Sequence, residues 1–217
     1  MDNGARRGIS GGMRCDADIL IVGGGLNGPT LALALARAGL SVALVDARPP
    51  DLRSAPNFDG RAYALALASV RLLGALGLWD ELAGVAQPIL AVRTAQGLAG
   101  QGRIGPAMGF DAAELDESVS GGAMGQMLED RHLHAALRRA ALAEPGITCH
   151  DGAAAVAQTL DAGGASLTLA DGRSFRGRLL VGADGRDSGV AMRAGIARTG
   201  RGYGQTALVC TLAVSRP

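Results

Sequence analysis

The stretch DILIVGGGLNGPTLALALARAGLSVALVD, residues 18–46, determines the fold class of this chain. Its apolar residues 19–22 form an uninterrupted run, which is typical of a parallel strand buried on both faces. A glycine-rich turn follows, and then a helix predicted to run to about Ala38 and to stop at Gly39, a common residue just past a helix end. Residues 41–45 predict a second strand. Strand, turn, helix and strand in this order indicate an α/β fold with a Rossmann-like domain.

Three glycines in the turn, Gly23, Gly25 and Gly28, have the G-x-G-x-x-G spacing of a dinucleotide-binding turn. The first glycine permits a tight turn, the second lets a pyrophosphate approach the backbone, and the third lets the helix pack closely on the strand. The helix dipole and the free N–H groups of the first turn attract an anion. Leu26 and Asn27 lie between the glycines. We therefore predict a pyrophosphate-binding site made by Gly23, Gly25, Leu26, Asn27 and Gly28.

An acidic residue stands where a ribose would need one. Asp46 ends the second predicted strand, about 20 residues past the glycines, where a carboxylate can accept hydrogen bonds from a ribose diol. Ala47 and Arg48 follow directly and complete this part of the predicted cofactor-binding set. The alternative is a βαβ turn that binds no ligand.

Glycine spacing alone is weak evidence in this chain, which has 34 glycines in 217 residues. About one G-x-G-x-x-G is expected by chance at this glycine content, and a second match does occur at Gly100, Gly102 and Gly105. It follows no apolar strand and precedes Pro106, so we predict a flexible loop there. The first match is distinguished by the strand, helix and acid around it.

Composition and charge exclude several classes of protein. Net charge is +1, from 21 basic and 20 acidic residues, which does not favour nucleic-acid binding. The three cysteines have no metal-like spacing and their odd number argues against a disulfide framework, so a cytoplasmic protein is the default expectation. We expect no metal site. Residues 1–15 lack the apolar core of a signal peptide and are predicted to be a disordered arm.

The rest of the chain is predicted from apolar periodicity and turn residues. After a loop over 47–59, we expect helices over 61–76 and 130–143, the second capped by Asp130. A glycine-rich loop is expected over 94–122. The predicted strands are 88–93, 147–150, 153–158, a hairpin of 166–170 with 174–176, the buried run 179–181, and 207–214.

The order of these pieces resembles one family. The dinucleotide unit is followed by Asp59-Gly60-Arg61, by Gly125-Gln126 and by GADGRDS at 182–188. This order is similar to that of the single-component FAD-dependent aromatic hydroxylases, the group that contains p-hydroxybenzoate hydroxylase. Within the group, the ubiquinone-biosynthesis hydroxylases are most similar. The narrower likeness lies in DGRAYALALASVRLLGALGLWDEL (59–82), LEDRHLHAAL (128–137) and GYGQTALVCTLA (202–213).

The resemblance implies a role for each matching residue. Gly23, Gly25 and Gly28 would hold the FAD pyrophosphate, and Asp46 would hold the adenosine ribose. Arg61 would lie along the pyrophosphate and ribityl chain. Gln126 would lie near the flavin linker, and Asp184-Gly185 would serve both FAD and the reduced nicotinamide. Each residue type suits its role, because a guanidinium matches phosphate oxygens and an amide both donates and accepts. The alternatives are a surface residue at a helix start for Arg61, a solvated loop for Gln126 and a helix N-cap for Asp184.

The resemblance also implies a domain division. Residues 16–86 and 125–197 would form a discontinuous FAD-binding domain, and residues 87–124 and 198–217 would form part of a β-rich substrate domain. Two departures from the family pattern stand out. Ala191 occupies the position where an arginine is usual, with Arg193 nearby. A third family fingerprint, a Gly-Asp pair, does not occur at its expected place, so we expect the chain to be an N-terminal portion.

The function that the resemblance implies is an NAD(P)H- and O2-dependent monooxygenase. It would hydroxylate an aromatic ring, with a polyprenylated phenol as the expected substrate, and none of its own residues would act as a nucleophile. Such a substrate would favour association with the inner membrane surface or with a biosynthetic complex. The alternatives are a non-catalytic FAD-binding or assembly subunit, and a flavin oxidase or reductase. Oligomeric state is not indicated by the sequence.

Overall fold

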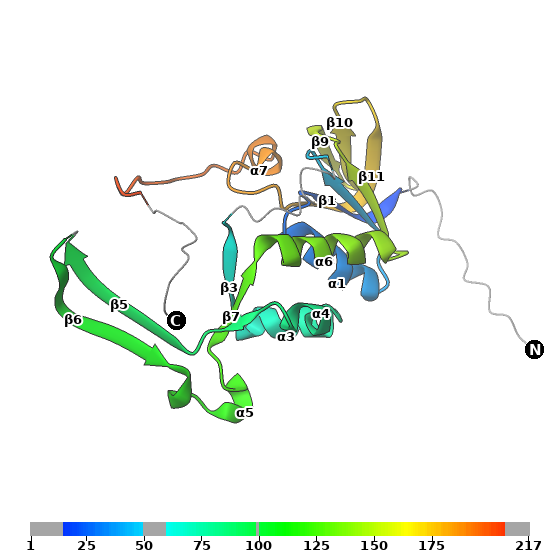
Figure 1. Cartoon of the computed structure of the whole chain (residues 1–217). Coiled ribbons are helices and arrows are strands. Elements are labelled where there is room, and N and C mark those ends of the chain that lie inside the picture. The colour runs from blue at the N-terminus through cyan, green and yellow to red at the C-terminus, as the bar shows by residue number, and fades with distance from the viewer. Residues whose placement is uncertain (1–14, 50–59, 99, 207–217) are drawn as a thin grey trace, which may run out of the picture. The chain divides into compact units, whose positions relative to one another are not determined.

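A computed structural model of the chain describes residues 15–49, 60–98 and 100–206 (Figure 1). The chain divides into two compact units. The first consists of Met1–Leu52 and Arg139–Arg201, and the second of Arg53–Arg138 and Gly202–Pro217. The division falls inside helix α6 (Asp130–Ala143), whose bounds confirm the helix predicted over 130–143.

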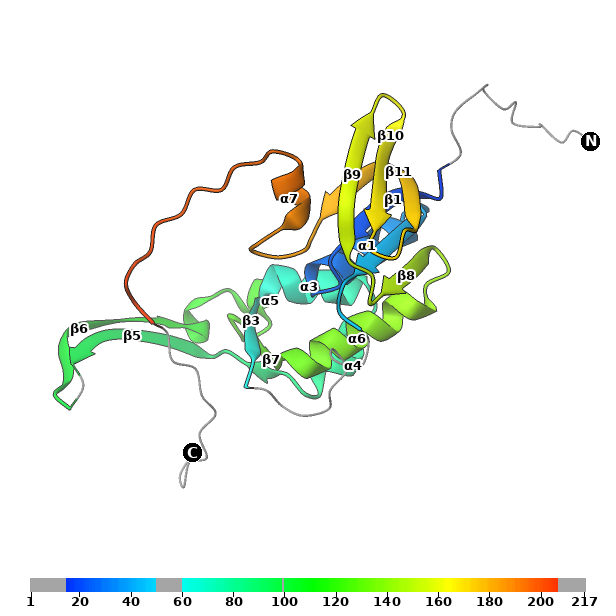
Figure 2. The ribbon, with the colours of Figure 1, turned by 90° about the horizontal axis from the view of Figure 1, so that it is seen from above.

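The first unit is built on a six-stranded sheet with the order β8-β2-β1-β11-β10-β9. Its strands are β1 (Ala17–Val22), β2 (Val42–Asp46), β8 (Ile147–Asp151), β9 (Ala155–Asp161), β10 (Gly164–Leu169) and β11 (Ser174–Gly182). Strands β8, β2, β1 and β11 run parallel to one another, while β10 pairs antiparallel with both β11 and β9 to form a meander (Figure 2). Two helices, α1 (Asn27–Arg37) and α7 (Gly189–Arg193), complete the described unit. The predicted α/β fold is confirmed.

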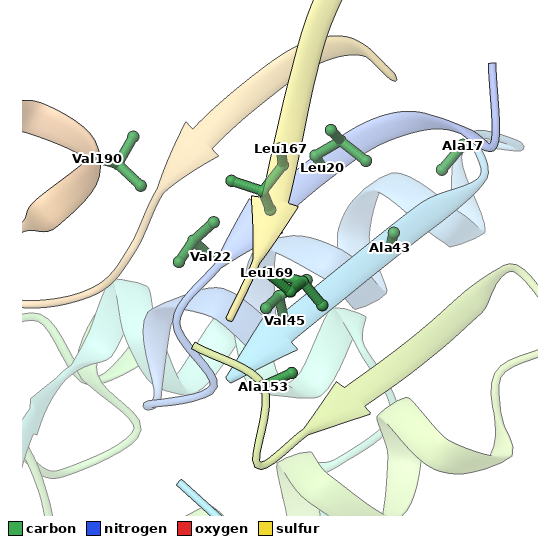
Figure 3. Packing of buried hydrophobic residues seen from close by; sticks show 9 residues of the cluster. All are labelled: Ala17, Leu20, Val22, Ala43, Val45, Ala153, Leu167, Leu169 and Val190. Atoms are coloured by element: carbon green, nitrogen blue, oxygen red, sulfur yellow. The ribbon is translucent and has the colours of Figure 1, made fainter. Parts of the chain in front are cut away.

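The central parallel strands β1 and β2 are covered on both faces, as their continuous apolar runs predict. On one face, Leu20 and Val45 pack with Leu167 and Leu169 of β10, and all four are at most 1% exposed (Figure 3). The opposite face carries α1, whose buried Gly28 lies next to the Leu44 side chain. Because successive side chains of a strand point to opposite faces, one apolar run supplies both cores.

One long strand, β11, belongs to both the meander and the parallel sheet. Its first residues pair with β10, and from Gly177 onward it pairs with β1. A Cβ on Gly177 would lie 2.7 Å from the Leu20 Cγ atom, so glycine lets β11 approach β1 at this crossover. The two strands predicted over 174–176 and 179–181 are therefore one. Burial of the run 179–181 was predicted wrongly for Leu179, which is 53% exposed because it points away from the meander side, where Leu180 packs.

The second unit contains a small antiparallel sheet with the order β3-β7-β4. Its strands are β3 (Ala62–Ala66), β4 (Gln87–Pro88) and β7 (Gly125–Glu129), and helices α3 (Leu67–Ala75) and α4 (Trp79–Ala83) belong to the same unit. The helix predicted over 61–76 is thus wrong in its first turn. There the chain forms β3, because pairing with β7 satisfies its backbone and partly buries the alternate side chains Tyr63 and Leu65.

A two-stranded hairpin of β5 (Ala91–Leu98) and β6 (Gly102–Asp111) also belongs to the second unit. A 3-10 turn, η1 (Ala112–Glu114), and a short helix, α5 (Glu117–Ser120), follow it. The loop predicted over 94–122 is therefore wrong. The second glycine match lies at the hairpin turn and in β6, where Gly100, Gly102 and Gly105 all have positive φ and no helix begins.

Several expectations stay untested. The predicted strand over 207–214 lies outside the described residues. So does the predicted arm over 1–15, except for its last residue, Cys15. The contact-based units place β3, α3, α4 and β7 with the hairpin, which differs from the predicted domain boundaries. Because these units follow from packing and carry no assignment of cofactor or substrate, the domain division remains a prediction. No helix in the described parts of the chain has the length and apolar character of a membrane span.

Candidate functional site

The carboxyl ends of β1, β2 and β11 meet at one edge of the parallel sheet. The Gly23 N–H donates to the Val45 carbonyl over 2.7 Å, and the Ala183 N–H donates to the Val22 carbonyl, also over 2.7 Å. These bonds bring residue 23 next to residue 183, although 160 positions separate them in the chain. Ligands of open α/β sheets bind outside the carboxyl ends of the strands, so this edge is the candidate functional site.

The turn between β1 and α1 is packed so closely that only glycine fits. Gly23 has φ of +116°, and a Cβ there would overlap the carbonyl group of Ala183. A Cβ on Gly28 would overlap the carbonyl oxygen of Gly23. The first and third glycines therefore do what the spacing predicted: one allows the tight turn, and the other allows the helix to pack on it.

Asp46 lies at the end of β2 and points into the turn, where it is only 4% exposed. The Gly24 N–H donates to its Oδ2 atom, and the Arg48 N–H donates to Oδ1 over 2.8 Å. A carboxylate oxygen is an acceptor that suits the hydroxyl groups of a ribose. The carboxylate thus lies beside the glycine turn between β1 and α1, which is the place expected for an acid that binds an adenosine ribose. Ala47 and Arg48 follow it and are exposed.

The start of α1 is free of competing acidic or capping groups. Leu26 occupies the N-cap position, where its side chain makes no capping hydrogen bond, and the first turn contains no acidic residue. Asn27, the first helical residue, is exposed. The N–H groups of a first helical turn have no intrahelical acceptor, and the helix dipole adds positive potential there. This end of α1 can therefore bind an anion.

Asp184 lies directly after Ala183 and holds the start of α7. Its Oδ1 atom accepts a hydrogen bond from the Ser188 hydroxyl, and its Oδ2 atom accepts one from the Val190 N–H over 3.1 Å. Burial alone would raise the pKa of the Asp184 carboxyl, but the hydrogen bonds from Ser188 and from backbone N–H groups outweigh it and lower that pKa below its usual value. The carboxylate is therefore ionised near neutral pH. Gly185 has φ of +90°, which explains the glycine.

Two other predicted residues, Arg61 and Gln126, lie in the second unit. Arg61 precedes β3, and its guanidinium forms an ion pair with Asp130 at 3.3 Å while remaining 57% exposed. Gln126 lies in β7, opposite Leu65 of β3, and is partly buried. The alternatives of a helix start for Arg61 and a loop for Gln126 are therefore wrong. Their predicted contacts with the cofactor remain predictions.

Sequence reasoning missed two residues of the site. Gly24 was passed over because it stands between the spaced glycines, yet its N–H anchors Asp46 and a Cβ there would overlap that carboxylate. Ser188 ends the motif GADGRDS, and the resemblance to the family gives it no role of its own. A serine four residues after an aspartate, just before a short helix, is a capping pattern that could have revealed its contact with Asp184.

The described residues fit the adenosine diphosphate half of FAD. The fit rests on three features of one unit: a turn that only glycine can form, a helix start open to an anion, and a buried carboxylate beside both. The end of β11 brings Asp184 to the same edge, where a carboxylate can accept a hydroxyl proton of the ribityl chain.

Comparison with known proteins gives the same answer. A family model described as an FAD binding domain matches residues 16–216. The ubiquinone hydroxylase UbiL of Rhodospirillum rubrum is 44% identical over 196 residues, which cover 90% of this chain and 43% of that protein. The 3-demethoxyubiquinol 3-hydroxylase of Escherichia coli is 32% identical over 197 residues, which cover 90% of this chain and 48% of that protein. The chain thus spans less than half the length of these curated relatives.

Solved structures share the fold. The flavin-dependent monooxygenase PieE, solved with FAD and substrate, has a TM-score of 0.66 and 25% identity, over 85% of this chain and 33% of that one. A PqsL variant from P. aeruginosa has a TM-score of 0.69 at 24% identity, over 85% of this chain and 47% of that one, and supports the fold alone. With the family model matching nearly the whole sequence, the chain belongs to the FAD binding domain family, and FAD is its cofactor.

Proposed function

We propose that this chain provides the FAD-binding part of a monooxygenase that hydroxylates an aromatic ring with NAD(P)H and O2. The substrate we infer is a polyprenylated phenol of ubiquinone biosynthesis. The observation that carries the proposal is the glycine-only turn closed by Asp46 and by the end of β11. The similarity to two hydroxylases of ubiquinone and demethoxyubiquinol supports the reaction class and the kind of ring.

The described residues bind and orient the cofactor and perform no bond-breaking step. The start of α1 would hold the pyrophosphate, Asp46 would accept the adenosine ribose hydroxyls, and Asp184 would accept a ribityl hydroxyl. We also propose that Arg61 and Gln126 contact the pyrophosphate and the flavin linker, because a guanidinium and an amide suit those groups. Bound FAD supplies the redox chemistry, accepting hydride from NAD(P)H and activating O2.

Asn27 offers a test that separates binding from folding. Asn27→Asp adds a negative charge to the first turn of α1, which favours the helix dipole but repels a pyrophosphate. We expect FAD to bind about tenfold more weakly, which corresponds to roughly 1.4 kcal/mol of repulsion, while the thermal midpoint stays constant or rises. Asn27→Ser, which adds no charge, is the matched control. Titration of FAD by fluorescence measures both affinities, and equal affinity of all three proteins would contradict an anion site here.

The reaction is tested on the same sample. The purified protein loaded with FAD should show oxidised flavin absorption that NAD(P)H bleaches and O2 restores, and a phenol added to the mixture should gain one hydroxyl group, detected by mass spectrometry. Flavin that binds but is not bleached by either nicotinamide would favour the non-catalytic binding or assembly subunit. Bleaching and reoxidation without hydroxylated product would favour an oxidase or reductase.

A prenylated substrate also suggests where the protein acts. Such a substrate resides in a membrane, so we propose that the protein associates with a membrane surface or a biosynthetic complex while it reacts. Co-sedimentation with vesicles that contain ubiquinone precursors would support a membrane surface. Failure to co-sediment, with binding to another biosynthetic enzyme in its place, would favour a complex.

A further inference from the structure

The backbone of Asp184 lies at the edge of the sheet, whereas its side chain is held by residues at the start of α7. The backbone of residues 183–184 lies against Gly23, where a Cβ would be 2.7 Å from the Asp184 nitrogen. The carboxylate instead turns toward α7, where the Ser188 hydroxyl and the Val190 N–H hold one oxygen each. The direction of the carboxylate therefore depends on the start of α7.

Ser188 forms the tighter of these two contacts and has a second bond that restricts it. Its hydroxyl donates to Asp184 Oδ1 over 2.5 Å and accepts a hydrogen bond from the Ala191 N–H over 3.0 Å. A hydroxyl has one proton, so the bond from Ala191 leaves that proton directed at Asp184. An alanine at this position would remove the donor and the helix cap together.

Helix α7 is itself held close to the end of β11. A Cβ on Gly182 would lie 2.9 Å from the Val190 Cβ atom, and Val190 is buried in the core of the first unit. The Gln158 side chain of β9 donates to the Val190 carbonyl over 3.1 Å. The helix start is thus anchored independently of Ser188. Loss of the hydroxyl would leave the carboxylate held only by the Val190 N–H, without removing α7 from the sheet.

We propose that Ser188 is a positioning residue for the cofactor: it fixes the Asp184 carboxylate, which in the proposed function accepts a ribityl hydroxyl of FAD. This inference rests on the proposed function, because it requires Asp184 to contact the flavin half of the cofactor. It separates the two halves of the site: Gly23, Gly28 and Asp46 serve the adenosine half, and Ser188 acts only on the flavin half.

The test compares FAD with ADP, which lacks the ribityl chain. We expect Ser188→Ala to weaken FAD binding about tenfold, the effect of one charge-assisted hydrogen bond, and to change ADP binding less than about twofold. Ser188→Thr keeps the hydroxyl and should bind FAD like the wild type. In a chain that already carries Asp184→Ala, Ser188→Ala should have no further effect on FAD, because the two residues act as one unit.

Each outcome separates the possible failures. Equal FAD affinity of Ser188→Ala and the wild type would overturn the inference and leave the proposed function intact. Equal weakening of FAD and ADP would also overturn it, because that result indicates only a structural cap. A wild-type chain that binds ADP but not FAD would overturn the proposed function and this inference with it.

Discussion

The parallel sheet of the first unit and the β5–β6 hairpin of the second unit bury their apolar side chains to very different degrees. In β1, Leu20 and Ile21 are both fully buried. In the hairpin, Val92 and Phe110 lie opposite each other and are 42% and 50% exposed. Strand composition therefore does not determine burial. What determines it is a second layer, which α1 and the meander supply for the parallel strands.

The two regions also differ in how they use charge. In the hairpin, Arg93 forms an exposed ion pair with Asp111 at 3.0 Å, on the face opposite Val92. At the parallel sheet, Asp18 joins the starts of β1 and β2, because its Oδ2 atom accepts hydrogen bonds from the Ser41 N–H and hydroxyl. The Arg93–Asp111 ion pair is exposed and lies within one hairpin, whereas Asp18 connects the starts of two neighbouring strands.

The largest expected difference comes from removing a buried side chain. Leu20→Ala leaves a cavity between β1 and β10 and should lower the free energy of unfolding by about 3 kcal/mol. Val92→Ala, the control in the hairpin, should cost less than about 0.5 kcal/mol because its side chain is already hydrated. Urea unfolding followed by far-UV circular dichroism, with hydrogen exchange of the β1 amides, measures both. Similar costs would show that the hairpin face is buried.

The second comparison adds a methyl group at two glycines that face neighbours at similar distances. A Cβ on Gly177 would lie 2.7 Å from the Leu20 Cγ atom, and a Cβ on Gly109 would lie 2.8 Å from the Arg93 Cδ atom. Gly177→Ala should cost about 1–3 kcal/mol, because the packed core cannot yield. Gly109→Ala should cost less than about 1 kcal/mol, because the Arg93 side chain can swing into solvent.

Unfolding midpoints in urea distinguish these two glycine variants. The sole tryptophan, Trp79, lies in α4 of the second unit, so its fluorescence reports on that unit separately. A Gly177→Ala protein as stable as the wild type would contradict the tight crossover of β11 over β1.

The smallest expected effect depends on pH. Hydrogen bonds from the Ser41 backbone and hydroxyl, with a smaller contribution from Arg178, lower the pKa of Asp18 below its usual value. A carboxyl whose pKa is lowered by folding stabilises the protein above the pKa of the unfolded chain, and this contribution disappears as the pH falls through the folded pKa. Asp18→Asn should therefore lower stability at pH of about 7 by less than about 1 kcal/mol, since the group is largely solvated.

The same variant should match the wild type at low pH. Thermal midpoints of both proteins, measured from about pH 7 down to about pH 2, should converge as Asp18 becomes protonated. Asp111→Asn provides the comparison in the hairpin. Hydrogen bonds from the Ala113 N–H and from Arg93 lower the pKa of Asp111, as the bonds from Ser41 lower that of Asp18. A constant difference across the whole pH range would show that the Asp18 charge is not the cause.

The conformation differs from the one that the sequence predicts where distant segments of the chain pair. Residues 62–66 were assigned to a helix, although Tyr63 and Leu65 alternate with alanines at the period of a strand. That alternation was a readable signal, but the alanines and leucines around it also favour a helix. Pairing with β7, about 60 residues further along the chain, decides the conformation. The hairpin was missed because its glycines and Pro106 resemble a loop.

The sequence by itself determined the β1–α1–β2 unit and the positions of Gly23, Gly28 and Asp46, because the relevant contacts lie within 29 residues and are fixed by strand period, helix period and glycine geometry. Only the tertiary structure decided that β11 joins β1, that Ala183 closes the turn at Gly23, and that Ser188 directs Asp184. Those contacts join residues far apart in the chain, and local propensity carries no information about which distant backbone will supply the missing hydrogen bonds.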